Sequence, residues 1–243
     1  MSRVVIISQA RMGSTRMPAK VLKTIEGCSL LDYHAARLKR SRSADAICFG
    51  IPDTAENDVL DDAAKALGVD VCRGSEHDVL ARYAACARTM KADIVVRVTS
   101  DCPFVAPELI DRTVEAFRRS PAADYAYMDL SSCARGFDVE VFSSAVLYDA
   151  ADKARTPHEL EHVTPFIYNH PDMFTLVAVE SGVSPLDSGR FCVDTTEDFA
   201  FATALIEHFG NQIAMQSADS SMRFVESRPA LMALNANVSQ TML

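Results

Sequence analysis

The sequence predicts an α/β protein with a mostly parallel sheet flanked by helices. Short runs of valine and isoleucine alternate with amphipathic segments along the first half of the chain. This alternation is typical of parallel strands joined by crossover helices. Helices are less regular in the second half, so we expect the sheet to be mixed there. No long linker or low-complexity run divides the 243 residues. We therefore expect one domain over residues 1–243, with residues 221–243 as a helical C-terminal tail.

Eight short apolar segments are expected to be strands, and eight amphipathic segments are expected to be helices. The expected strands are 4–8, 46–51, 69–72, 94–98, 124–128, 139–142, 175–179 and 191–193. The expected helices are 30–40, 57–67, 78–91, 108–119, 144–153, 158–169, 197–209 and 222–235.

Charge and cysteine usage exclude several classes of protein. A net charge of −9 argues against non-specific nucleic-acid binding, which needs a basic face. No apolar run approaches the roughly 18 residues of a membrane span, and the apolar start is too brief for a signal peptide. The seven cysteines are scattered without a Cys-x-x-Cys pair, which argues against a disulfide framework and a structural zinc site. We expect a cytoplasmic protein that binds neither nucleic acid nor membranes.

Residues 10–20, which read ARMGSTRMPAK, have the composition of a phosphate-binding loop. They follow the first strand at its carboxyl end, where open α/β sheets bind ligands. Small residues let backbone amides approach phosphate oxygens, and the two arginines and the lysine can neutralise them. The loop is neither a Walker A motif, which ends in Gly-Lys-Ser/Thr, nor a dinucleotide fingerprint, because Gly13 stands alone. The alternative is a solvated basic surface loop.

The stretch 9–22 resembles the opening motif of the cytidylyltransferases, most closely the spore coat polysaccharide biosynthesis protein F family. CMP-KDO and CMP-acylneuraminate synthetases are more distant relatives. Five further phrases resemble this family in the same order: 73–83, 97–103, 135–142, 161–167 and 193–199. Departures from the family pattern are Met17 for leucine, Ala19 for glycine, Ser100 for glycine and Thr196 for proline. Ala19 is harmless only if its position needs no positive φ.

The resemblance implies the nucleotide-diphospho-sugar transferase fold, which is GT-A-like. It also implies transfer of CMP from CTP to a sugar-like acceptor, with release of pyrophosphate and Mg²⁺ as the cofactor. A nonulosonic acid, a KDO-like sugar or another polysaccharide precursor would fit as acceptor. We expect a homodimer, because relatives are commonly dimers and the apolar tail has no obvious core partner in its own domain.

Nucleotide binding is expected mainly from the first loop. The candidate residues are Ala10, Arg11, Met12, Gly13, Ser14, Thr15, Arg16, Lys20, Arg73, Thr99 and Ser100. Arg16 and Lys20, with Asp101, are the candidate catalytic residues, because cations can neutralise the leaving diphosphate. Arg73 follows a short strand, and the alternative for it is a plain surface cation. Arg97 could contact the nucleotide or an internal carboxylate.

Asp101 and Asp194 each follow a predicted strand, and the resemblance matches both to the family's metal-binding aspartates. Two carboxylates at neighbouring strand ends can share one Mg²⁺, which prefers oxygen ligands and keeps several waters. The alternative for Asp194 is a helix cap, because a glutamate follows it three residues later. Asp198 is an auxiliary ligand or a first-turn acid that compensates the helix dipole.

Acceptor binding is expected from Asp138, Glu140 and His162. The two acids are two residues apart on a predicted strand, so both side chains face one way and could bind sugar hydroxyls or an amine. An exposed strand face is the alternative for the acids, and a helix-surface histidine is the alternative for His162.

Two other functions stay open at this stage. Residues 158–162 read HELEH, which is the His-Glu-x-x-His pattern of zinc peptidases. No third ligand follows at metzincin spacing, and the other motifs would be left unexplained. The second alternative is a non-catalytic relative that binds nucleotide or sugar.

Overall fold

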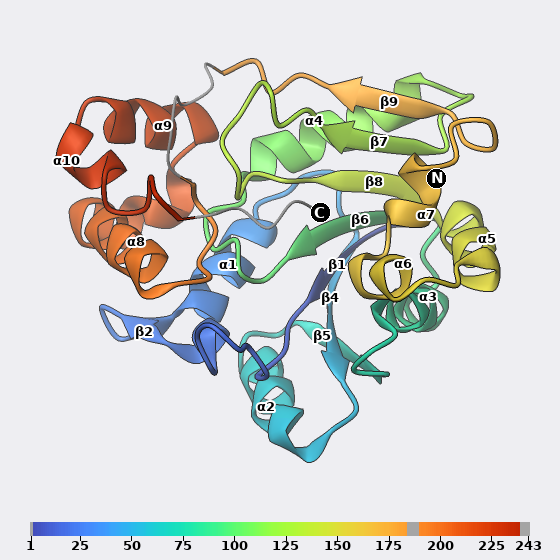
Figure 1. The fold of residues 1–243 in the computed structure, drawn as a ribbon, viewed down its shortest axis with the longest axis horizontal. Coiled ribbons are helices and arrows are strands. Elements are labelled where there is room, and N and C mark those ends of the chain that lie inside the picture. The colour runs from blue at the N-terminus through green and yellow to red at the C-terminus, as the bar shows by residue number, and fades with distance from the viewer. Residues whose placement is uncertain (1, 184–189, 239–243) are drawn as a thin grey trace.

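A seven-stranded sheet forms the centre of the protein, in a computed structural model that describes residues 2–183 and 190–238 (Figure 1). The strand order is β5-β4-β1-β6-β8-β7-β9. Only β8 runs antiparallel to its neighbours, so the mixed, mostly parallel sheet is confirmed. The strands are β1 Val4–Gln9, β4 Ala46–Pro52, β5 Asp70–Gly74, β6 Ile94–Thr99, β7 Tyr125–Met128, β8 Glu140–Ser143 and β9 Leu176–Val179.

Helices cover both faces of this sheet (Figure 1). They are α1 Leu30–Leu38, α2 Asp58–Ala66, α3 Val79–Met90, α4 Pro107–Arg119, α5 Ser144–Lys153, α6 Pro157–His162, α7 Pro165–Tyr168, α8 Thr196–Phe209, α9 Ala218–Glu226 and α10 Pro229–Met232. Helices α1, α2, α4, α8 and α9 pack in one hydrophobic core, and α3, α5 and α7 pack in the other.

The interior strand β1 shows why the protein has two cores. Val4 and Ile6 point into the first core, whereas Val5 and Ile7 point into the second. Alternate side chains of a strand face opposite sides of a sheet, and here both sides are buried. The uninterrupted apolar run of β1 is therefore what a doubly covered strand requires.

Seven of the eight predicted strands form within two residues of their expected bounds, but the eighth, 191–193, is wrong. This segment makes single backbone hydrogen bonds to two different places, from Phe191 N to Arg135 O and from Val193 N to Asp101 O, both at 2.7 Å. It is apolar because its side chains fill the core, where Phe191 packs against Phe137 with ring centroids 4.7 Å apart.

Two predicted helices are each divided in two by a proline. The expected helix 158–169 ends at His162, Val163 adopts a φ of 72°, and α7 begins at Pro165. The expected helix 222–235 begins earlier, as α9, and a second short helix starts at Pro229. Proline lacks the amide hydrogen that would continue the preceding helix and clashes with its last turn.

The C-terminal tail has a core partner in its own domain over its described residues 221–238, contrary to the expectation from sequence, and residues 239–243 lie outside the described part of the chain. Met222 and Val225 of α9 are buried in the first core, together with Leu231 of α10. The tail therefore gives no support to a homodimer. No helix within the described residues is long and apolar enough to cross a membrane.

Ala19 adopts a left-handed conformation, with φ 53° and ψ 27°, just before the 3₁₀ turn Lys20–Leu22. Its amide donates to Met12 O at 3.0 Å, which closes the first loop on itself. The position that carries glycine in relatives therefore does need a positive φ, and an alanine there is strained by about 1–2 kcal/mol.

We expect Ala19→Gly to raise the free energy of unfolding by about 1 kcal/mol, because relieving this strain outweighs the extra backbone freedom of glycine. Chemical denaturation measures the change. Gly68→Ala is the matched control, because Gly68 has a φ of +61° and open space around its missing side chain. It should lose a similar amount, and a loss of stability in Ala19→Gly would contradict this account.

Candidate functional site

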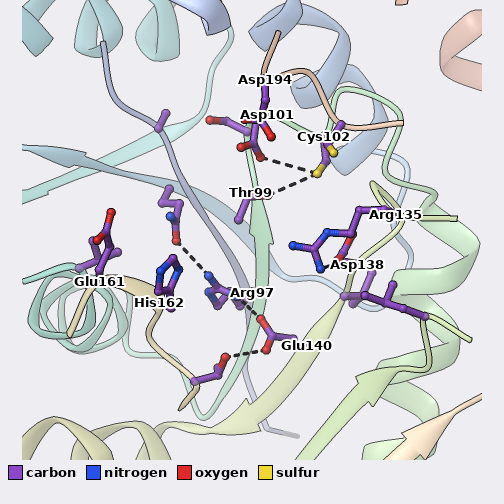
Figure 2. A pocket seen from close by; sticks show the side chains of 18 of the residues that line it. Arg97, Thr99, Asp101, Cys102, Arg135, Asp138, Glu140, Glu161, His162 and Asp194 are labelled. Atoms are coloured by element: carbon purple, nitrogen blue, oxygen red, sulfur yellow. Dashed lines mark hydrogen bonds and ion pairs between the residues drawn. The ribbon is translucent and has the colours of Figure 1, made fainter. Parts of the chain in front are cut away.

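A cavity of about 630 Å³ opens at the carboxyl ends of β1 and β6 and extends over β7 and β8. Figure 2 shows part of its lining. The structure brings most predicted site residues to this cavity: Ala10, Arg11, Ser14, Thr15, Arg16, Lys20, Thr99, Ser100, Asp101, Asp138, Glu140, His162 and Asp194. Met12, Gly13 and Arg73 do not line it.

Lys20 joins the two aspartates that sequence singled out. Its Nζ lies 2.9 Å from an oxygen of Asp101 and 2.6 Å from an oxygen of Asp194, although the residues are far apart in sequence. The lysine side chain is only 12% exposed. Burial opposes its charge, but the two carboxylates raise the pKa of Lys20 above its usual range. Burial likewise acts against ionised Asp101, and Lys20 lowers the pKa of that carboxyl below its usual range. The carboxylates of Asp101 and Asp194 thus both contact the ammonium group of Lys20.

The segment that carries Asp194 is fixed by a buried ion pair. Arg190 donates to Asp198 at 2.9 and 2.5 Å and to Asp194 at 3.0 Å. Val193 N also donates to the backbone oxygen of Asp101, which ties the two aspartate-bearing segments together. Both carboxylates are therefore held at the same side of the cavity, as Figure 2 shows.

The capping alternative for Asp194 is excluded. The cap of α8 is Thr195, whose hydroxyl accepts from Asp198 N, and the Asp198 carboxylate accepts from Thr195 N in return. Asp198 is completely buried, and its carboxylate is engaged by this capping box and by Arg190, which favours the structural alternative for it over the auxiliary-ligand one. The Asp194 carboxylate faces the cavity, where Arg16 approaches it at 3.2 Å.

A second charged network lies deeper in the cavity, around Glu140. The Glu140 carboxylate pairs with Arg97, as Figure 2 shows. It also accepts hydrogen bonds from Tyr125 and, at 2.7 Å, from Thr164. Burial alone would lower the pKa of Arg97, but Glu140 raises it above its usual range. The sequence left open whether Arg97 contacts the nucleotide or an internal carboxylate, and in the structure its partner is the carboxylate of Glu140.

Asp138 lies before β8 rather than within it. The expectation that Asp138 and Glu140 face one way because they share a strand is therefore wrong, although both residues line the cavity. It pairs with Arg135 at 3.0 Å and accepts from Gly136 N at 2.7 Å. Burial raises the pKa of Asp138 despite this partner. Gly136 has a φ of 103°, and a Cβ there would lie 2.5 Å from the backbone of Phe191, so only glycine fits this turn.

Arg73 has a structural position. Its guanidinium pairs with Asp58 at 2.7 Å and donates to Thr54 O at 2.9 Å, which joins β5 to the start of α2 outside the cavity. Met12 is turned towards the core, and its amide donates to Asn57 at 2.9 Å. Arg73 does not line the cavity, and its two terminal guanidinium nitrogens are engaged by Asp58 and Thr54 O, so the structure places it apart from the other predicted nucleotide-binding residues.

In the His-Glu-x-x-His pattern at residues 158–162, the glutamate caps a helix. Glu159, the glutamate of that pattern, forms a capping box with Thr156 at the start of α6. The rings of His158 and His162 lie with their centroids 4.7 Å apart and their planes tilted by 53°, but no third metal-binding group joins them within the described residues. His162 lines the cavity, and burial lowers its pKa.

Sequence reasoning missed Arg190 and the hydroxyl groups that surround Glu140. Arg190 lies four residues before Asp194, just outside the phrase that resembles the family, so no motif pointed to it. Tyr125 lies in the predicted strand 124–128, and the sequence pattern gives it no functional role. Both kinds of residue act through another side chain, which a linear pattern does not reveal.

A family model described as cytidylyltransferase matches residues 4–226. The chain is 32% identical to an uncharacterised protein, MJ1063, of Methanocaldococcus jannaschii, over 98% of this chain and 96% of that protein. It is 33% identical to the spore coat polysaccharide biosynthesis protein SpsF of Bacillus subtilis, over 87% of this chain and 90% of that protein.

Solved structures of a cytidylyltransferase and of a CMP-sugar synthetase superpose on this chain. A cytidylyltransferase from Leptospira borgpetersenii superposes with a TM-score of 0.89 at 28% identity, over the whole of both chains. A CMP:2-keto-3-deoxy-manno-octonic acid synthetase complexed with CTP superposes with a TM-score of 0.68 at 17% identity, over 85% of this chain and 99% of the other. The second likeness shows a shared fold.

We expect Glu140→Gln to destabilise the protein by about 3 kcal/mol, because it leaves the buried Arg97 charge without its partner. Urea unfolding measures this. Asp149→Asn is the control, because Asp149 pairs with Lys153 on the surface of α5 and its loss should cost less than about 1 kcal/mol. Equal, small effects in both variants would contradict a buried, essential pair.

Proposed function

The chain belongs to the cytidylyltransferase family, and on that premise we propose that it transfers CMP from CTP to a sugar or sugar-acid precursor of surface polysaccharide, releasing pyrophosphate. The observation that carries the proposal is the convergence of Lys20, Asp101, Asp194 and Arg16 in one cavity. A protein that only bound nucleotide would have no need to hold two acids against one buried cation. This argues against a non-catalytic relative.

In the proposed reaction an acceptor hydroxyl oxygen attacks the α-phosphorus of CTP. The bond between that phosphorus and the oxygen bridging to the β-phosphorus breaks, pyrophosphate leaves, and the hydroxyl proton passes to solvent water. Negative charge grows on the leaving diphosphate, and Arg11, Arg16 and Lys20 are the cations that would stabilise it. The protein contributes position and electrostatics rather than a covalent nucleophile.

The donor set at Asp101 and Asp194 fits Mg²⁺. Their oxygens lie within 2.9 Å of the same lysine nitrogen, so they are close enough to share one cation. Two carboxylates leave room for the water and phosphate oxygens that Mg²⁺ also takes. Bound Mg²⁺ would stabilise charge on the phosphate oxygens. Lys20 would then be free to pair with phosphate.

The acceptor is proposed to bind over β7 and β8, where Asp138, Glu140 and His162 line the cavity. Glu140 is held rigidly by three partners, so it can orient a sugar hydroxyl without moving. The names of the Bacillus subtilis relative and of the CTP-bound synthetase support a polysaccharide precursor and CTP, respectively. A homodimer is proposed from the family resemblance alone.

We expect CTP with Mg²⁺ to raise the melting temperature more than ATP, GTP or UTP with Mg²⁺, because a ligand that binds only the native state stabilises it. Differential scanning fluorimetry at equal nucleotide concentrations measures the shifts. Equal shifts in melting temperature for the four nucleotides would contradict the proposal that CTP is the nucleotide substrate.

Asp101→Asn and Asp194→Asn should each lower turnover by orders of magnitude, since each removes a charged ligand from the site where the transition state gains charge. The double variant should lose far less than the product of the two effects. Pyrophosphate release with a panel of acidic sugars and alditol phosphates is the assay.

Ser217→Ala is the control for this pair. Ser217 caps α9, away from the cavity, so the variant should lose about 1 kcal/mol of stability and keep its turnover. A fully active Asp194→Asn enzyme would leave Asp101 without its proposed partner.

A further inference from the structure

Three cysteines outside the cavity converge between β4, β5 and α3. Cys48, Cys72 and Cys86 are buried, none is in a disulfide, and their sulfur atoms all lie within 4.8 Å of one another. No other group of three cysteine, histidine or acidic side chains is this close within residues 2–183 and 190–238. The proposed function makes no use of them.

A glycine on β4 makes this convergence possible. Gly50 pairs with Cys72 across the parallel strands, and Cys48 lies two residues earlier on the same face of β4. A Cβ at Gly50 would lie 3.3 Å from the Cys86 sulfur, so that sulfur sits over the space left by the missing side chain. The strands supply two thiols, and the helix supplies the third from above.

The spacing of the sulfurs suits one metal ion. A zinc–thiolate bond is about 2.3 Å long, so three sulfurs around one ion lie about 4 Å from each other. Thiolates select soft or borderline cations, whereas Mg²⁺ and Ca²⁺ take oxygen. An iron–sulfur cluster would need a fourth protein ligand, and no acid, histidine or further cysteine joins the three within the described residues. A zinc-class ion can instead take three protein ligands and one small ligand such as water.

The positive charge of Arg82, next to the cluster, favours a divalent ion. Arg82 lies one helical turn before Cys86 on α3, and its Cγ is 3.9 Å from the same point above Gly50. Arg82 is 2% exposed and forms no ion pair with a carboxylate in the described part of the chain. Its Nη1 donates to the backbone oxygen of Ser75, and its Nε has no hydrogen-bond partner. A buried cation without an acid favours an anionic neighbour. Three thiolates around a divalent ion carry one negative charge, which Arg82 would balance.

We propose that Cys48, Cys72 and Cys86 form a site for one thiophilic divalent cation of the zinc and cadmium class, with Arg82 as its counter-charge. On binding, three thiols become thiolates and three protons are released for each ion taken up. A bound ion would connect β4 and β5 to α3. Because Arg82 also lines the cavity, binding of the ion would affect the position of a cavity-lining side chain.

Titration of the reduced full-length chain with Cd²⁺ tests the proposal. We expect one ion per chain, sulfur-to-cadmium charge-transfer absorption, and three protons released per ion in weak buffer. Cys48→Ser, Cys72→Ser and Cys86→Ser should each weaken binding on the order of 100-fold or more. Arg82→Met should weaken it less, and Arg82→Lys should restore part of the loss.

Cys133→Ser is the matched control, because Cys133 is a buried cysteine outside the cluster and should leave binding unchanged. X-ray absorption of the wild-type chain loaded with Zn²⁺ needs no variant to fold, and it should find three sulfur neighbours at about 2.3 Å. A shell of only nitrogen and oxygen, no binding by the wild type, or equal binding by the three serine variants would overturn the proposal.

Discussion

The ammonium group of Lys20 between Asp101 and Asp194 is the interaction on which the rest of the site depends. Two carboxylates brought this close would repel each other in a half-buried cavity, and a single cation resolves that repulsion. The arrangement also defines where a second cation could bind, since it would replace the lysine between the same oxygens. Under the proposed function, cation binding in this cavity would therefore exchange the partners of the two aspartates rather than fill an empty site.

The charged residues around this point divide into fixed and adaptable groups. Arg190 and Arg97 are nearly buried and held by Asp198 and Glu140, so they position other side chains. The side chains of Arg11 and Arg16 are 46% and 45% exposed, and each has one acidic partner that a phosphate could displace. This division explains how a chain of net charge −9 can offer an anion a local positive site. Buried pairs set geometry, and exposed ones remain available to the ligand.

Local patterns in the sequence predicted the sheet, and they also predicted that the first loop and Asp101 lie at one edge of it, because each depends on neighbouring residues. The strand at 191–193 could not be separated from a core-filling segment, since both demand apolar side chains. Arg73 had the charge and place of a nucleotide ligand, but the acids of α2 engage it. The cysteine cluster depends on strand register and on the gap at Gly50, which no spacing of cysteines along the chain reveals.

A crystal structure with CTP and Mn²⁺, which takes the same oxygen ligands as Mg²⁺, tests the central claim most directly. We predict an anomalous peak coordinated by both Asp101 and Asp194, with the Lys20 ammonium moved from the carboxylates to a phosphate oxygen. A peak elsewhere in the cavity, with Lys20 still bridging the two aspartates, would contradict the account.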